Sequence, residues 1–512
     1  MNILEWIDVG KVSAERDENL HYYFSDNGIL KNIIASPSSF LILGRKGAGK
    51  TALFNFLKSN ENDYLEKGNK LTTLNFDDYD WNVHTLLFDS SKAESMAYKQ
   101  SWIFVILVES IKQISEYYKE NRINPPKLFI NTNKLLEKLF ESPIPSLSKI
   151  IGRKILGLSK LKLPSGGLDL ESGDLDSISI NAGEITFEEV RQNHTLQSHL
   201  AENIKNIIAH LQNAILSLNR NDISIFIAFD RVDEAWDESS FQQSKKVIAG
   251  LISANDYFTS KFKNLIRPIL FLREDIFHSL SINDANKLLE DCGRLLSWKK
   301  ESLEKLILER INYFAKNSNI PNITSIDNLF DKKEMRQRTK PFTYILKRTM
   351  MRPRDLISYM RRIIETMKEN NDDPFQESKK DYKKLETESI YLAEPGYSEW
   401  LKQEIIDEWK VQKPEIFKIF SVLQNNSYTT ITKEEFINGF STIGEEITNE
   451  QANEYIRFLF NNSIVGFKIG SSNEWKYKCF YPTQGFIDSP EYRVHDGLSR
   501  GLNLKETRGK DN

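Results

Sequence analysis

Runs of consecutive apolar residues along the chain predict the strands of a parallel sheet. The runs are rich in β-branched and aromatic residues, as strands covered on both faces usually are. They occupy Phe40–Leu43, Ile223–Asp230 and Ile266–Asp275, with a further candidate at Leu71–Trp81. Helical patterns begin at about Lys50 and cover Glu94–Tyr118 and roughly Thr186–Leu218. Strands that alternate with helices predict an α/β core with a doubly wound parallel sheet.

The pattern changes beyond about Leu288, where helical spacing dominates as far as about Asn370. Asn371–Asp381 is polar and typical of a linker. Short helical patterns then precede the β-like stretch EWKYKCFY, and this order indicates a winged helix. We expect four parts: an α/β core over residues 1–285, a helical lid over 286–370, a linker and connecting helix over 371–409, and a winged-helix-like domain over 410–500.

Residues 141–190 differ from the rest of the core in their turn residues and their charge pattern, which predicts an insertion within the core. Alternating leucines flank a Ser-Gly-Gly turn in LKLPSGGLDLES, which predicts a hairpin. Charge is segregated into a basic run followed by an acidic run: Lys149, Arg153, Lys154, Lys160 and Lys162, then Asp169, Glu171, Asp174 and Asp176. The basic run is the best candidate patch for nucleic acid or an acidic partner, although such runs are more often solvated faces.

Composition narrows the class of protein. The 512 residues carry a net charge of −3, which gives no overall attraction to nucleic acid or to an anionic membrane. The two cysteines, Cys292 and Cys479, lack metal-binding or redox spacing and predict a reducing compartment. The longest apolar run, Trp102–Val108, is too short to span a bilayer, and the first residues do not resemble a signal peptide. We expect a cytoplasmic protein with no membrane partner and no structural metal.

The segment after the first strand carries the strongest chemical signal. It matches the phosphate-loop pattern G-x-x-x-x-G-K-[ST], in which glycines let backbone N–H groups curl around phosphates at the start of a helix. The predicted nucleotide-binding residues are Gly44, Arg45, Lys46, Gly47, Ala48, Gly49, Lys50 and Thr51. In such a loop Lys50 reaches the β- and γ-phosphates of ATP, and the hydroxyl of Thr51 ligates Mg²⁺.

A phosphate loop also needs a carboxylate at the end of a neighbouring buried strand to hold the magnesium ion. Asp230, which ends the run IFIAFD, is the expected magnesium residue. Asp233 or Glu234 can orient the attacking water, or both can simply cap the next helix. Position 231 is arginine where many ATPases carry a catalytic glutamate, which argues against fast hydrolysis.

Arginines are candidates for sensing the γ-phosphate. Arg273 ends the third apolar run, where it can touch the phosphate or pair with Asp230 or Glu274. Arg354 follows Pro353 in the first turn of a predicted helix, from which it can reach back to the phosphates or pair with a neighbouring acid, Asp355. Arg294 is a weaker candidate, as a finger that acts on a neighbouring subunit.

The combination of GRKGAGKTAL, IFIAFDRVDEAW, ILFLRED and MRPRDLI resembles a family of bacterial P-loop ATPases with a D-R-[LV]-D-E Walker B motif. That family is close to the STAND and origin-recognition-like branch of the AAA+ ATPases. The resemblance covers about residues 10–500, including AERD…LHYYF and YRVHDGL. It implies that Arg273 is a sensor-1 residue, that Arg354 is a sensor-2 residue in the lid, and that the carboxy-terminal domain is a winged helix.

The resemblance also implies a nucleotide-gated switch. Such relatives often oligomerise, and many act in prokaryotic anti-phage defence. We therefore expect an ATPase whose nucleotide state controls its assembly into a homo-oligomer or an effector protein partner. No nuclease or protease constellation appears in the sequence.

The alternative function is an ATP-dependent regulator or loader that grips DNA with its winged helix and basic patch. The second helix of the winged-helix domain, expected over Ile447–Ser463, carries Glu450 and Glu454 against a single Arg457. A recognition helix should be basic, because acids repel phosphates. This composition favours packing or partner binding over DNA.

Overall fold

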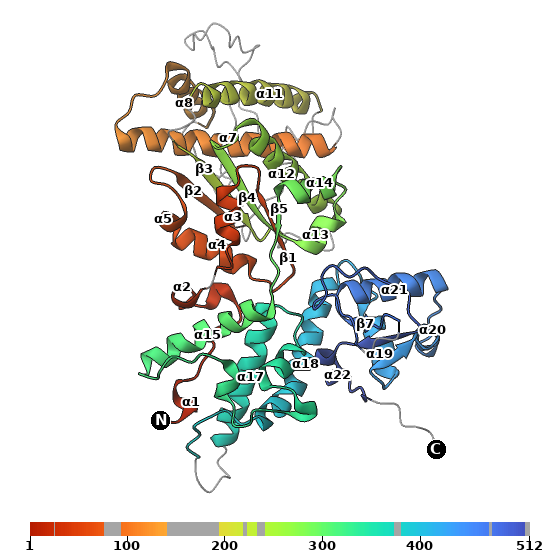
Figure 1. Ribbon diagram of the computed structural model, residues 1–512. Coiled ribbons are helices and arrows are strands. Elements are labelled where there is room, and N and C mark those ends of the chain that lie inside the picture. Colours follow the sequence, from red (N-terminus) through yellow and green to blue (C-terminus); the bar gives the residue numbers. More distant parts are fainter. Residues whose placement is uncertain are drawn as a thin grey trace, which may run out of the picture. The chain divides into compact units, whose positions relative to one another are not determined.

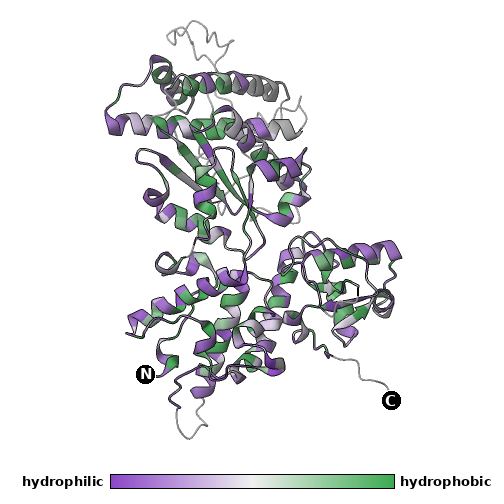
Figure 2. Cartoon of the chain, in the orientation of Figure 1, coloured by the Kyte–Doolittle hydropathy of each residue, from purple (hydrophilic) through white to green (hydrophobic). Residues whose placement is uncertain are grey.

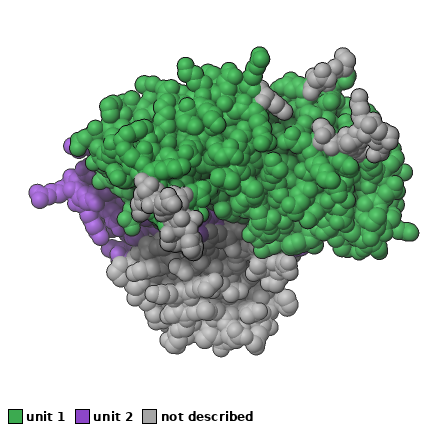
Figure 3. All heavy atoms as spheres, turned by 90° about the horizontal axis from the view of Figure 1, so that it is seen from below, with its two compact units in different colours: residues 1–25, 46–52, 297–512 green, residues 26–45, 53–296 purple. Residues whose placement is uncertain are grey.

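The computed structural model describes residues 1–24, 26–75, 94–140, 194–218, 223–232, 241–372, 380–470 and 474–506. The chain forms two compact units, which Figure 3 colours separately. The α/β unit comprises residues 26–45 and 53–296. The helical unit comprises residues 1–25, 46–52 and 297–512, so it includes most of the phosphate loop as well as the carboxy-terminal half.

The α/β unit is built on a five-stranded sheet in which every pair of neighbours is parallel. Its order is β2 (Lys70–Asn75), β3 (Ile225–Asp230), β4 (Ile266–Arg273), β1 (Leu41–Gly44) and β5 (Gly293–Leu295). All residues of β1 and β3 are buried, as the apolar runs predicted. Figure 2 shows these strands as hydrophobic. The sequence did not indicate β5.

Helices of the α/β unit cover the sheet and one another. The longest, α7 (Glu94–Asn121), packs on α12 (Phe241–Lys261) and on α11 (His194–Leu216), and α8 (Lys127–Phe140) lies beside α11 (Figure 1). Trp102 shows why α7 is buried around most of its circumference. Its ring meets Phe229 of β3 edge to face at 5.9 Å, and its indole N–H donates to the carbonyl of Val247.

Shorter helices complete the α/β unit. They are α3 (Ile29–Ala35), α5 (Glu61–Tyr64), α13 (Glu274–Ser279) and α14 (Ala285–Cys292). The helix α4 (Lys50–Ser59) starts in the phosphate loop. The expected insertion at 141–190 and the second half of the strand expected at Leu71–Trp81 lie outside the described residues.

The helical unit gathers around α17 (Pro353–Asn371) and α18 (Glu388–Trp409), which pack side by side (Figure 1). Its further helices are α15 (Lys300–Asn317) and α16 (Pro341–Leu346), with the short α1 (Ile3–Trp6) and α2 (Leu20–Tyr23) from the start of the chain. Arg310 of α15 fixes this amino-terminal segment, because its guanidinium donates to the carbonyl of Val9 and to the carboxylate of Asp17.

The carboxy-terminal part of this unit has the connectivity of a winged helix. Its elements are α19 (Ile416–Asn425), β6 (Thr430–Thr432), α20 (Lys433–Thr442), α21 (Asn449–Asn461), β7 (Val465–Phe467) and β8 (Glu491–Val494). The strands form an antiparallel sheet of order β6-β8-β7. Capping boxes begin both α20 and α21. The expected fold class, an α/β P-loop core followed by helices and a winged helix, is confirmed.

The wing differs from the sequence expectation. The stretch EWKYKCFY at 474–481 forms only an isolated bridge, between Lys476 and Phe467, and the returning strand is Glu491–Val494. No helix in the described parts of the chain is long and apolar enough to cross a membrane.

His495 sits in the core of the winged helix, directly after β8. Its Nδ1 accepts the backbone N–H of Gly497, and the rings of Tyr477 and Phe480 lie against it. Burial lowers the pKa of His495 to about 4. The folded protein therefore favours the neutral imidazole.

We expect acid to destabilise the helical unit through His495. His495 of the unfolded chain binds a proton near the usual pKa of 6.5, whereas His495 of the folded chain does so only near 4. The contribution of the neutral imidazole to the free energy of unfolding is therefore complete above pH 6.5 and is lost as the pH falls from 6.5 towards 4. Between pH 7 and pH 5 the loss should be about 2 kcal/mol. Thermal unfolding of wild type and His495→Gln at both pH values measures it. Equal falls in melting temperature would contradict the expectation.

Candidate nucleotide-binding site

The ends of three neighbouring strands bring the predicted residues of the α/β unit to one edge of the sheet. Gly44, the last residue of β1, is in register with Arg273, the last residue of β4. β4 also pairs with β3, which ends at the buried Asp230. Arg273 therefore ends the strand between the strand that leads into the phosphate loop and the strand that carries Asp230.

Arg273 makes a close ion pair at this edge. Its Nε and Nη2 donate to the two carboxylate oxygens of Asp275, at 3.0 and 2.7 Å. Sequence reasoning had offered Asp230 or Glu274 as structural partners. Glu274 instead lies 3.7 Å from Nε of Arg45, at the beginning of the phosphate loop.

The residues around Asp230 are only partly described. Arg231, next to Asp230, has a φ of +60°, a left-handed conformation that a side chain with a Cβ rarely adopts. The chain therefore turns sharply as soon as β3 ends. Asp233 and Glu234, the candidates for orienting water, lie outside the described residues.

Two glycines shape the phosphate loop. Gly47 has a φ of +79° and Gly49 a φ of +101°, so both occupy conformations that favour glycine. A Cβ on Gly47 would lie 3.0 Å from the Cβ of Arg354. The loop backbone is thus approached closely by the first turn of α17.

Three consecutive carbonyls of the loop accept hydrogen bonds from the helical unit. The donors are the guanidinium of Arg352, the backbone N–H of Arg354 and the indole N–H of Trp298. Arg352 donates to the carbonyl of Lys46 at 3.2 Å, and Arg354 donates to that of Gly47 at 3.3 Å. Trp298 donates to the carbonyl of Ala48 at 2.7 Å. Arg354 therefore lies at the loop, as a residue that senses bound phosphate must.

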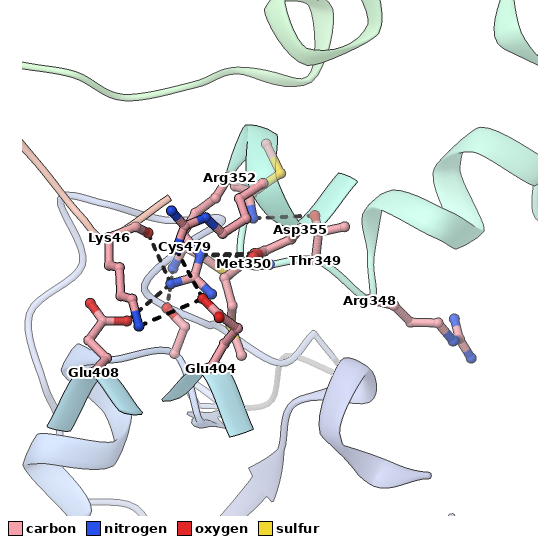
Figure 4. Close-up of polar contacts among 12 residues, drawn as sticks. Lys46, Arg348, Thr349, Met350, Arg352, Asp355, Glu404, Glu408 and Cys479 are labelled. Carbon is pink, nitrogen blue, oxygen red and sulfur yellow. Dashed lines mark hydrogen bonds and ion pairs between the residues drawn. The ribbon is translucent and has the colours of Figure 1, made fainter. Parts of the chain in front are cut away.

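Acidic side chains of α18 complete this cluster. Glu404 binds Nη1 of Arg354 at 3.0 Å and lies 3.8 Å from Nζ of Lys46. Glu408, one turn further on, accepts from Arg352 at 3.2 Å. Figure 4 shows Lys46, Arg352 and the two glutamates converging from three segments of the chain.

Arg352 is the buried centre of the cluster. Its Nε donates to Asp355, whose carboxylate also accepts the backbone N–H of Met350 (Figure 4). Burial disfavours the charged guanidinium of Arg352. The carboxylates of Asp355 and Glu408 favour it more strongly and raise the pKa of Arg352 above its usual value. Asp355, which sequence reasoning had considered as the partner of Arg354, is therefore held by Arg352.

Sequence reasoning missed four residues of this cluster: Trp298, Arg352, Glu404 and Glu408. Arg352 lies inside the motif MRPRD, and the two glutamates have the i, i+4 spacing that places side chains on one helix face. Such spacing is common on solvated faces, so it did not point to the loop. Arg294, the weaker finger candidate, lies in β5 and donates to the carbonyl of Gly293.

Thr51 and Asp230, the expected magnesium ligands, belong to different compact units. Within the described ranges, no group of three or more His, Cys, Asp or Glu side chains could hold a metal ion. Each of the three bonded carbonyls belongs to a planar trans peptide, so the N–H of that peptide points away from the donor that the carbonyl meets. Such a backbone fits an anionic phosphate.

We expect Arg352→Ala to destabilise the helical unit by about 3 kcal/mol, because it leaves the buried Asp355 without its cation. The matched control is Arg361→Ala on the same helix, which removes a solvent-exposed pair with Glu365 and should cost well under about 1 kcal/mol. Chemical denaturation of the three proteins without nucleotide measures the difference. Similar midpoints for the two variants would show that the Arg352 cluster contributes little.

Comparisons with known proteins find similarity to one family model, to a transposon-encoded protein and to solved structures. Residues 301–406 match the model of the FunZ-associated C-terminal helical domain. An 80.3 kDa protein of transposon gamma-delta from Escherichia coli (strain K12) is 25% identical in an alignment of 523 positions. The alignment covers 97% of this chain and 67% of that protein.

Solved structures give weaker matches. Cdc6p from Pyrobaculum aerophilum is 12% identical over 93% of this chain and 89% of its own, with a TM-score of 0.27. A chain of Drosophila ORC bound to DNA is 10% identical over 98% and 90%, with a TM-score of 0.30. TM-scores this low do not establish a common fold. The family match falls on α15–α18 and includes α17 and α18, the helices that carry Arg354 and Glu404.

Proposed function

We propose that this chain is an ATP-binding, slowly hydrolysing switch ATPase whose nucleotide state controls its oligomerisation or an effector protein partner. One observation carries the proposal. Residues 46–52 of the phosphate loop belong by packing to the helical unit, and their carbonyls are bonded by residues next to α15 and α17. A ligand of this loop therefore acts directly on the unit that carries the winged helix.

The residues have the following proposed roles. Loop N–H groups and Lys50 bind the phosphates, while Thr51 and Asp230 hold Mg²⁺. Asp233 or Glu234 orients the attacking water, and Arg231, in place of a glutamate, keeps hydrolysis slow. Arg273 and Arg354 respond to the γ-phosphate as sensors.

The switch itself is a competition for cations. Glu404 binds Arg354 and lies near Lys46, so a γ-phosphate offers these cations a second anion. ADP lacks that group and competes less well. Because a ligand shifts an equilibrium only by its difference in affinity for two states, Arg354 and Glu404 supply the difference that separates ATP from ADP.

The helix α18 connects this competition to the winged helix. Its middle is in close contact with the end of the chain: a Cβ on Gly501 would lie 2.8 Å from the carbonyl of Ser398, and the N–H of Gly501 donates to the hydroxyl of Ser398. Glu404 lies less than two turns further along α18. A movement of Glu404 away from Arg354 would therefore reach the winged helix through a rigid element.

The winged helix favours a protein partner over DNA. Glu450 is exposed near the start of α21, and Glu454 forms an ion pair with Lys413 at 2.8 Å. Carboxylates on this helix oppose phosphate contacts. A role in prokaryotic anti-phage defence rests on the resemblance described above and remains part of this proposal.

The first test is particle size by light scattering, together with phosphate release, for wild type, Lys50→Ala and Arg354→Ala. We expect wild type to assemble with ATP and not with ADP, because only ATP carries the γ-phosphate. Lys50→Ala should bind neither nucleotide well. Arg354→Ala should keep ADP binding within about twofold and lose ATP-dependent assembly. Assembly of Arg354→Ala equal to wild type would remove Arg354 from this role, and stimulation by duplex DNA without assembly would favour the DNA regulator.

The competition model makes a second prediction at Glu404. Glu404→Gln removes the anion that holds Arg354, so ATP should bind about tenfold more tightly while ADP changes little. Glu399→Gln is the matched control, because Glu399 lies on the same helix and pairs with Lys402. Titration calorimetry with both nucleotides measures the effect. Unchanged or weaker ATP binding in Glu404→Gln would contradict the competition.

A further inference from the structure

We propose that Trp298 is a positioning residue of the phosphate loop, whose indole N–H turns the Ala48–Gly49 peptide so that the N–H of Gly49 faces a bound phosphate. The inference rests on the proposed function, because it assumes that the loop binds a nucleoside di- or triphosphate. It assigns the helical unit a part in building the phosphate site, beyond sensing what the site holds.

The contact between Trp298 and the loop is specific. The indole Nε1 donates to the carbonyl of Ala48 at 2.7 Å, a short distance for an N–H···O hydrogen bond. The ring also lies next to the loop, because a Cβ on Gly49 would be 3.9 Å from Cζ2 of the indole. The half-buried ring packs against the hydrophobic core of the helical unit, which fixes the direction of its N–H.

Peptide geometry converts this carbonyl contact into control of an N–H group. A trans peptide is planar, and its C=O and N–H point in nearly opposite directions. A carbonyl of Ala48 held towards Trp298 therefore holds the N–H of Gly49 away from Trp298. The φ of +101° at Gly49 lies in a region that glycine populates readily, so the local backbone does little to fix the orientation of the Ala48–Gly49 peptide.

The same reasoning applies to the two preceding peptides. Arg352 holds the carbonyl of Lys46, and the backbone N–H of Arg354 holds that of Gly47. Each of the N–H groups of residues 47, 48 and 49 is thus held on the side of its peptide away from these donors, and consecutive N–H groups of this kind form an anion-binding nest where they converge. Of the two side chains that contribute, Arg352 is also needed by the buried Asp355, whereas the indole of Trp298 has a single N–H, which donates to the loop.

Positioning and sensing predict different nucleotide selectivity. A loss of nest geometry affects the phosphates that ADP and ATP share, so both affinities should fall together. A loss of Arg354 affects the γ-phosphate alone. The ratio of the two dissociation constants therefore distinguishes Trp298 from a sensor.

The test uses the full chain and replaces Trp298 by phenylalanine, which keeps an aromatic ring and removes the N–H. We expect dissociation constants for ADP and ATP, measured by calorimetry, each to rise about tenfold, with the melting temperature without nucleotide unchanged. Trp400→Phe is the matched control, since Trp400 packs in the same helical core on α18 and should leave both constants unchanged.

Each outcome decides between the alternatives. Wild-type affinity in Trp298→Phe would overturn the inference, as would a loss confined to ATP. If Trp298→Phe is also less stable without nucleotide, Trp298→His, which retains a ring N–H, should recover binding, and equal losses in both variants would overturn the inference. If wild type itself binds neither nucleotide, the proposed function fails instead.

Discussion

The buried guanidinium of Arg352 is the interaction on which the organisation of the helical unit depends. It binds a carbonyl of the phosphate loop, the carboxylate of Asp355 at the start of α17 and the carboxylate of Glu408 on α18. A charge in such a place is costly unless every part of it is paired. The loop and the two helices must therefore keep their mutual arrangement for as long as Arg352 stays buried, which makes the loop part of the helical unit.

The proposed switch depends on a difference between two parts of this cluster. Arg352 is enclosed and paired, whereas Arg354 and Lys46 are partly exposed and share one carboxylate, Glu404. In the proposed switch, the inner pair holds the helices together while the outer cations exchange Glu404 for a phosphate. That proposal divides stability and response between two arginines that lie two residues apart.

The winged helix is attached to this cluster by dense packing. A Cβ on Gly497 would lie only 2.1 Å from the carbonyl of Arg348, so the backbone of the last helix, α22 (Asp496–Ser499), touches the chain just before α17. A densely packed interface changes between discrete arrangements, so it transmits a shift better than a flexible interface does. The placement of glycine where two backbones meet is therefore part of the proposed route from loop to partner.

Much of the fold and part of the site could be predicted from local patterns. Continuous apolar runs placed β1, β3 and β4, because a strand buried on both faces has no polar alternation, and the glycine and lysine spacing placed the phosphate loop. The order of helices also predicted the winged helix, although its returning strand is Glu491–Val494 and not the expected EWKYKCFY. By contrast, β5 is only three residues long, too short for periodicity to reveal.

The partners of the loop were decided by tertiary structure alone. Trp298, Glu404 and Glu408 are distant from the loop in sequence, and their residue types are common in ordinary helices and connections. Only folding brings them to the carbonyls and cations of the loop, because hydrogen bonds between distant segments leave no period in the sequence. The sequence itself determined where the phosphate-loop motif lies, and the packing of the helical unit decided which residues contact that loop.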